Sequence, residues 1–186
     1  MVRSMVLEFT EDKNCQYLAS QYMLGDSLLV APILNDKSMA EYYLPEGTWT
    51  SLLSGDVKEG GKWYKEEHGY LSIPLYAKEG SIVAMGAVDN DPVYDYADGV
   101  EFRIYALKDG KSAGTVVYNT DNQVDAAIKA CNDGGVYKIS VESAKAYKVV
   151  LVNAGAPTEV VGAGYEMAGN DVIISTECNK EIVIKY

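Results

Sequence analysis

The sequence is poor in the side chains that most often bind metals. It contains one histidine, His68, and three cysteines, Cys15, Cys131 and Cys178, none of which forms a CxxC pair. Ligands scattered in this way argue against a zinc site, and we expect neither a metal nor another cofactor. Isolated thiols in a chain without an export signal are typical of the reducing cytoplasm, which is therefore the expected location.

Positive charge and long apolar runs are also scarce. The 186 residues include 16 Lys and Arg against 27 Asp and Glu, which gives a formal net charge of −11 at pH 7. Without a basic surface, nucleic acids and anionic membranes are not expected as partners. The longest nearly apolar stretch, Leu28 to Leu34, is far shorter than the roughly 20 residues of a spanning helix. The N-terminus reaches an acidic residue at Glu8, which does not fit a signal peptide.

Phenylalanine and tryptophan are rare, with two residues each, whereas tyrosine occurs 15 times. Tyrosine is favoured in half-buried strands, so packing is the simpler interpretation. Its flat ring and polar tip also suit sugar and interface contacts. Trp49 and Trp63 fall in neighbouring expected strands, with Tyr64 and Tyr70 nearby. We take these four residues as candidate sugar or interface contacts, with core or inter-domain packing as the alternative.

The first part of the chain predicts one βα unit. Val2 to Phe9 is short and largely apolar, as in a strand buried on both faces. In Glu11 to Leu24, the residues Cys15, Leu18 and Tyr22 recur at helical spacing. Because a parallel strand needs neighbours, such a unit cannot stand alone. It indicates that partner structure precedes it.

From Leu28 onward the pattern is β. Tyr42 to Leu44 and Thr48 to Leu53 flank the turn Pro45–Glu46–Gly47, which predicts a hairpin. Gly86 to Gly99 is acidic and lacks an apolar period, so it is expected to connect two β modules. Further strands are expected at 28–34, 63–67, 70–77, 81–85, 101–106, 115–118, 124–130, 136–141, 146–152, 171–175 and 181–185. Short strands at this spacing indicate an antiparallel sandwich.

Catalytic patterns are not evident. A glycosidase needs two carboxylates that face each other across the scissile bond, whereas most acidic residues here lie in turns or on polar strand faces. A Ser–His–Asp triad would have to use His68, and no GxSxG elbow is present. Four aspartates of the connecting segment could hold calcium or form a solvated linker, and their spacing does not match an EF-hand. They are Asp89, Asp91, Asp95 and Asp98.

Several long segments resemble the C-terminal part of glycoside hydrolase family 31. They are RSMVLEFTED, QYMLGDSLLVAPIL, YYLPEGTWT and GGKWYKEEHGYLSIPLYAKEGSIVAMG, in order from about Val2 to Gly86. They look most similar to the bacterial α-xylosidase branch. Glu101 to Leu107 with Asp109–Gly110 resembles the start of the family's last domain, and beyond about Ser112 the likeness rests on position and β pattern.

The resemblance implies an architecture. Residues 1–27 would be the last βα unit of a (β/α)8 barrel, 28–96 the proximal C-terminal β domain and 97–186 the distal one. The expected fold is mainly β, with two antiparallel β-sandwich-type modules after a βα unit left over from the barrel. The family's catalytic aspartates lie on earlier barrel strands, so no residue here inherits a catalytic role.

The resulting hypothesis is a non-catalytic C-terminal fragment of a family 31 α-glycosidase that supports the barrel of the parent enzyme. The expected partners are the missing barrel and N-terminal domains. Without them, residues 2–9 should pack on the proximal domain, be disordered, or self-associate with a second copy, because unpaired strand edges recruit other strands. The alternatives are a sugar-binding β-sandwich module and a hydrolase active by itself.

Overall fold

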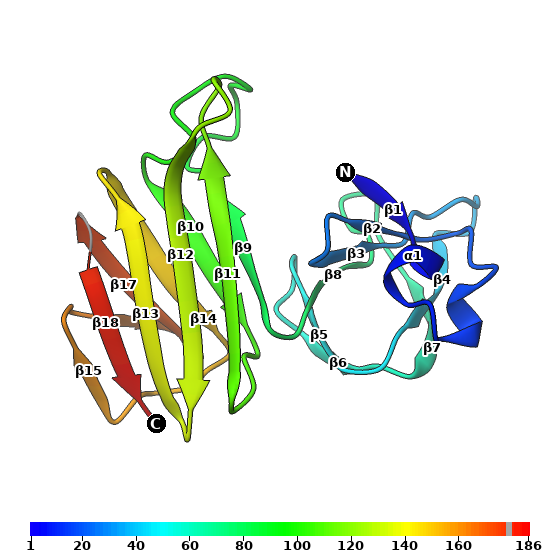
Figure 1. Ribbon diagram of the computed structural model, residues 1–186. Helices are drawn as coiled ribbons and strands as arrows, with labels where there is room; N and C mark the ends of the chain where they lie inside the picture. Colours follow the sequence, from blue (N-terminus) through cyan, green and yellow to red (C-terminus); the bar gives the residue numbers. More distant parts are fainter. Residues whose placement is uncertain (178–179) are drawn as a thin grey trace. The chain divides into compact units, whose positions relative to one another are not determined.

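The computed structural model describes residues 1–177 and 180–186 (Figure 1). Cys178, one of the three isolated cysteines, lies outside these residues. The chain divides into two compact units, Met1–Glu79 and Gly80–Tyr186. No helix in the described part of the chain is long and apolar enough to cross a membrane.

The first unit is built from an antiparallel sheet and a separate two-stranded ribbon. The sheet has the order β1-β2-β3-β8-β5-β6, and the ribbon pairs β4 with β7. The elements are β1 (Val2–Ser4), α1 (Met5–Glu8), the 3-10 turn η1 (Lys13–Cys15), β2 (Tyr22–Leu24), β3 (Leu28–Val30), β4 (Met39–Leu44), β5 (Thr48–Ser51), β6 (Val57–Glu59), β7 (Lys62–Glu67) and β8 (Leu75–Lys78). Their shared core includes the fully buried side chains of Met5, Leu29, Tyr42 and Trp49.

The prediction of a βα unit at the N-terminus is wrong. β1 pairs antiparallel with β2, and the chain then turns through α1, which buries Met5 in the core of the first unit. The segment 2–9 therefore packs on this β unit, which is one of its three expected fates. The strand prediction for Val2 to Phe9 failed because an apolar run of this length fits a buried strand or a buried helical turn equally well.

The helix expected at Glu11 to Leu24 is replaced by one 3-10 turn, an irregular stretch and β2. The Asp12 carboxylate accepts a hydrogen bond from the Asn14 backbone N–H at 3.0 Å, which favours a local turn over a continued helix. Gln21 is buried and bonds both backbone groups of Tyr43, at 2.7 and 2.8 Å. The Gln21 contacts attach this stretch to β4, and the helical spacing of its apolar residues did not indicate such an attachment.

The hairpin predicted around Pro45–Gly47 is also wrong. β4 pairs with β7, whereas β5 pairs with β6 and β8, so the turn carries the chain from the ribbon to the sheet. The crossing is fixed by backbone bonds from Gly60 N–H to Gly47 O at 2.7 Å and from Gly61 N–H to Leu44 O at 2.8 Å. The local turn signal was correct, but these non-local contacts decide the pairing.

The second unit consists of two five-stranded sheets. Their orders are β16-β17-β14-β10-β9 and β11-β12-β13-β18-β15. The strands are β9 (Ser81–Met85), β10 (Val100–Tyr105), β11 (Lys111–Tyr118), β12 (Val124–Asp133), β13 (Val136–Ser143), β14 (Ala146–Val152), β15 (Glu159–Val161), β16 (Glu166–Ala168), β17 (Asp171–Glu177) and β18 (Lys180–Lys185). In Figure 1, β11, β12, β13 and β18 lie in front of β10, β14 and β17.

Alternation along these strands builds the core of the second unit. Ala126, Ile128 and Ala130 of β12 are buried, as are Phe102 and Ile104 of β10, and all belong to one apolar cluster. The predicted mainly β, antiparallel architecture is confirmed, apart from the parallel pair β10–β14. β9, which the sequence placed with the first module, pairs with β10 here. The segment 86–99 contains no strand, as expected, but it joins β9 to β10 within the second unit and does not connect the two units.

Candidate functional site

Trp49, the first of the four candidate contact residues, is fully buried on β5. Its indole N–H donates to the Pro45 carbonyl oxygen at 2.7 Å, and its ring lies 6.2 Å from that of Phe9. The ring is covered by the chain itself, so Trp49 is a core residue in this structure and presents no face to a ligand.

The other three candidates do not form one surface. Trp63 and Tyr64 are neighbours on β7 and so point to opposite faces of the ribbon. Trp63 is half exposed and contacts Tyr43 across the ribbon, whereas the Tyr64 hydroxyl donates to Glu59 O at 2.7 Å. Tyr70 is fully exposed in the loop before β8. A single aromatic platform is therefore absent, and ligand contacts by Trp63 and Tyr70 stay predictions.

A tyrosine cluster that the sequence did not indicate lies inside the first unit. The rings of Tyr64 and Tyr76 stack against Tyr42, each with a centroid separation of 5.7 Å. The Lys58 ammonium lies 4.6 Å from the ring centroid of Tyr64, 5.5 Å from that of Tyr42 and 5.4 Å from that of Tyr76. The members come from β4, β6, β7 and β8, so the cluster joins the ribbon to the six-stranded sheet.

The polar atoms of this cluster satisfy one another. The Tyr42 hydroxyl donates to Glu66 Oε2 at 2.7 Å and lies 2.9 Å from the Tyr76 hydroxyl. Lys58 Nζ donates to the Tyr42 oxygen at 2.8 Å and forms an ion pair with Glu66. Burial, with the bonds to Tyr76 and Glu66, raises the pKa of Tyr42 far above its usual range. Burial alone would raise the pKa of Glu66, but the bonds from Lys58 and Tyr42 outweigh it and lower that pKa.

We expect the Glu66→Gln variant to lose stability in a pH-dependent way. Because the folded state lowers the pKa of Glu66, its contribution is present above the unfolded value of about 4.3 and is lost as pH falls through the folded value. The Glu66 side chain is 35% exposed, so solvent screening limits the loss to about 1 kcal/mol at pH 7. Urea unfolding of both proteins between pH 7 and 3 should show the difference shrinking as pH falls.

A matched control is Glu41→Gln. Glu41 pairs with Lys65 at 3.5 Å on the exposed side of the same ribbon. Exposed pairs of this kind add little stability. A stability difference for Glu66→Gln that is independent of pH, or equal to that of Glu41→Gln, would contradict the role given to the cluster.

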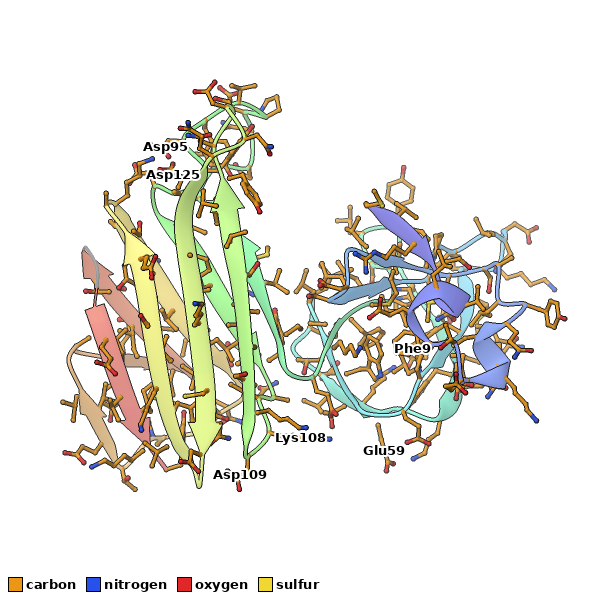
Figure 2. All side chains as sticks on the ribbon, in the orientation of Figure 1. Phe9, Glu59, Asp95, Lys108, Asp109 and Asp125 are labelled. Carbon is orange, nitrogen blue, oxygen red and sulfur yellow. The ribbon has the colours of Figure 1, made fainter. Side chains whose placement is uncertain are left out.

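Carboxylates elsewhere are also held by cations. Glu8 lies between Arg3 and Lys78, at 3.3 and 3.6 Å. Asp95 and Asp125 share the ammonium of Lys145 at 2.6 and 2.5 Å, and Figure 2 shows both at the same end of the second unit. The bond from Lys145 lowers the pKa of Asp95. A glycosidase acid needs the opposite, a carboxyl with a raised pKa opposite a second carboxylate.

The aspartates of the acidic segment 86–99 are not arranged as the ligands of a metal ion. Asp91 accepts a bond from the Val93 N–H at 2.9 Å, and Asp95 is bound to Lys145. Within residues 1–177 and 180–186, no three His, Cys, Asp or Glu side chains gather in a way that could hold a metal ion.

Two family models match successive parts of the chain. One, described as "Glycosyl hydrolase family 31 C-terminal domain", matches residues 1–83, and another, "Alpha-xylosidase YicI, C-terminal domain", matches residues 95–186. The α-xylosidase XylQ of Lactiplantibacillus pentosus is 39% identical over 120 residues, covering 63% of this chain and 16% of the relative. An α-xylosidase of Emericella nidulans is 36% identical over 112 residues, covering 56% of this chain and 14% of the relative.

A solved structure extends the match to the whole chain. The cycloalternan-forming enzyme from Listeria monocytogenes, in complex with a pentasaccharide substrate, is 25% identical with a TM-score of 0.84, covering 100% of this chain and 20% of that chain. The chain therefore spans a fifth or less of the length of these relatives.

Proposed function

We propose that this chain, which belongs to glycoside hydrolase family 31 as an α-xylosidase-like C-terminal region, is non-catalytic and supports the catalytic domain of its enzyme. The observation that carries the proposal is the pair of C-terminal family models, which match residues 1–83 and 95–186 in succession. A region with two apolar cores of its own can fold beside a barrel and stabilise it.

The ion-paired carboxylates of the chain favour a structural role. The partly buried carboxylates of Glu8, Glu66 and Asp125 are tied to cations that neutralise them. Such pairs link strands and segments, as Lys145 links the segment 86–99 to β12. For Glu66, the bonds from Lys58 and Tyr42 also lower the pKa, which leaves this carboxyl group unsuited to protonate a leaving group.

We propose α-xylosides as the substrate class of the enzyme. This finer step rests on the α-xylosidase description of the second family model and on the two α-xylosidase relatives at 39% and 36% identity.

Turnover by residues 1–186 alone tests the non-catalytic part of the proposal. The purified chain, incubated with p-nitrophenyl α-xyloside, should release no nitrophenol above a buffer blank. Turnover that survives repurification and scales with the amount of chain would contradict the proposal and favour a hydrolase active by itself.

We further propose that the β1 edge is a contact surface, either for the catalytic domain or for a second copy. β1 is a terminal strand of its sheet, and Val2 is 62% exposed opposite Leu24, which is 44% exposed. Free edges with apolar side chains pair with other strands. Sedimentation of residues 1–186 should show concentration-dependent dimers that Val2→Lys weakens. A monomer at every concentration would contradict self-association.

A further inference from the structure

Two loops of the first unit enclose a depression of about 630 Å³. One loop, residues 31–38, connects β3 to β4, and the other, residues 68–74, connects β7 to β8. Small-molecule sites usually have volumes of about 300–1,000 Å³. Loops placed by a rigid sheet are also where binding residues most often lie. The depression therefore has the size and the position of a ligand site.

The lining of the depression is neutral, which is unusual for a chain with a net charge of −11. Its polar side chains are Asn35, Ser38, His68, Tyr70 and Ser72, and no Asp, Glu, Lys or Arg is among the described residues that line it. Isoleucine and leucine side chains complete the wall. A neutral wall of hydroxyl, amide and ring groups suits an uncharged ligand rich in hydroxyl groups.

Tyr70 and Ser38 offer groups that the chain itself does not use. Tyr70 is fully exposed, so both faces of its ring are open. Within the described residues, neither the Tyr70 nor the Ser38 hydroxyl has a hydrogen-bond partner. A pyranose ring has an apolar C–H face that stacks on such a ring and a rim of hydroxyls that bond to such groups.

The walls of the depression are held in place before any ligand arrives. The two loops are joined by bonds from His68 N–H to Ser38 O at 2.9 Å and from Ala31 N–H to Pro74 O at 3.0 Å. Asn35 fixes its own loop by accepting bonds from the Lys37 and Met39 N–H groups. A preformed site loses less conformational entropy on binding.

His68 connects the depression to the tyrosine cluster behind it. Its Nδ1 lies 2.9 Å from the Ser72 hydroxyl oxygen, and its Nε2 faces Glu66 Oε2 at 3.8 Å. Glu66 is itself held by Lys58 and Tyr42. The Ser72 contact ties the imidazole to the loop 68–74, whereas its Nε2, facing the cluster, forms no hydrogen bond within the described residues.

We infer that this depression binds an uncharged pyranose sugar, with the Tyr70 ring stacking on the sugar and the Ser38 and Ser72 hydroxyls bonding its rim. This sugar-binding function goes beyond support of the catalytic domain and does not depend on it. It would hold a saccharide on the C-terminal region without any reaction taking place there.

The single histidine of the chain gives a direct test. Methyl α-D-xylopyranoside is titrated into residues 1–186 while the ring C–H resonances of His68 are followed by ¹H NMR. We expect a saturable shift, and we expect glycerol, which has hydroxyls but no ring, to give none. Tyr70→Ala should weaken binding about tenfold, the usual effect of losing one aromatic contact.

The matched control is Tyr17→Ala, because Tyr17 is 93% exposed but does not line the depression. Its binding should equal that of the unchanged chain. Both tyrosines are exposed, so neither substitution should alter the thermal unfolding temperature. A loss of binding by Tyr70→Ala can then be attributed to the missing ring and not to unfolding. The inference is overturned if no saturable shift occurs, if glycerol shifts His68 equally, or if Tyr70→Ala and Tyr17→Ala bind alike.

Discussion

Replacing Trp49 with alanine should lower the unfolding free energy of the first unit by about 3–5 kcal/mol, the usual cost of removing a large buried aromatic side chain. Trp49 is fully buried in the core of that unit, and its N–H satisfies the Pro45 carbonyl. The substitution therefore leaves a cavity and an unpaired acceptor together. Urea unfolding can be followed by the fluorescence of Trp63, the tryptophan that remains.

Trp63→Ala is the matched control, with Trp49 as the remaining fluorophore. Trp63 is 51% exposed on β7, so its loss should cost well under half as much. The assignment of Trp49 to the core, and of Trp63 to the surface, would be contradicted if the two variants were destabilised equally.

The second large effect is expected for Gly60→Ala. A Cβ atom at this position would lie 1.8 Å from the Pro45 carbonyl oxygen and 2.9 Å from the Gly47 oxygen. Both are backbone atoms at the crossing between the ribbon and the sheet, so neither can rotate away. We expect a loss of about 3 kcal/mol, the upper end of the usual cost of overpacking. Thermal unfolding followed by tryptophan fluorescence reports on the first unit, which contains both tryptophans.

Gly69→Ala separates this clash from the general effect of losing a glycine. Nothing lies within 4 Å of a Cβ at Gly69, which belongs to the same unit. The change should be neutral or slightly stabilising, because it restricts the unfolded chain. Equal effects at Gly60 and Gly69 would show that the close approach at Pro45 is not present in solution.

The strands of the second unit could be predicted because each buries one face on a shared core. Phe102, Ile128 and Ile139 alternate with exposed or half-buried neighbours, and the period of two is visible in the sequence. The parallel pairing of β10 with β14 could not be predicted, because alternation indicates which face is buried but not which strand lies alongside.

The first unit was harder to predict because non-local contacts override its local patterns. Gln21 bonds the backbone of Tyr43, and Gly60 bonds that of Gly47, which displaces the expected helix and hairpin. Each of these contacts joins residues at least 13 positions apart. Short-range periodicity carries no information about such partners.

The candidate contact residues were chosen by type, and the structure separates them by burial. Trp49 lies in the core, while Tyr70 is fully exposed beside a neutral depression. The excess of tyrosine fits the packing interpretation, since Tyr42, Tyr64 and Tyr76 form a packed cluster around Lys58. The sequence could not show this, because the cluster is assembled from strands that are distant along the chain.

The support of a catalytic domain is tested most directly by thermal inactivation of a family 31 α-xylosidase whose C-terminal region is replaced by residues 1–186. If the region acts as a support, the chimaera hydrolyses α-xylosides, and Trp49→Ala in the graft lowers the inactivation temperature without changing kcat/KM below it. The structural role would be contradicted if three proteins shared the same inactivation temperature: the chimaera, its Trp49→Ala variant and the enzyme without its C-terminal region.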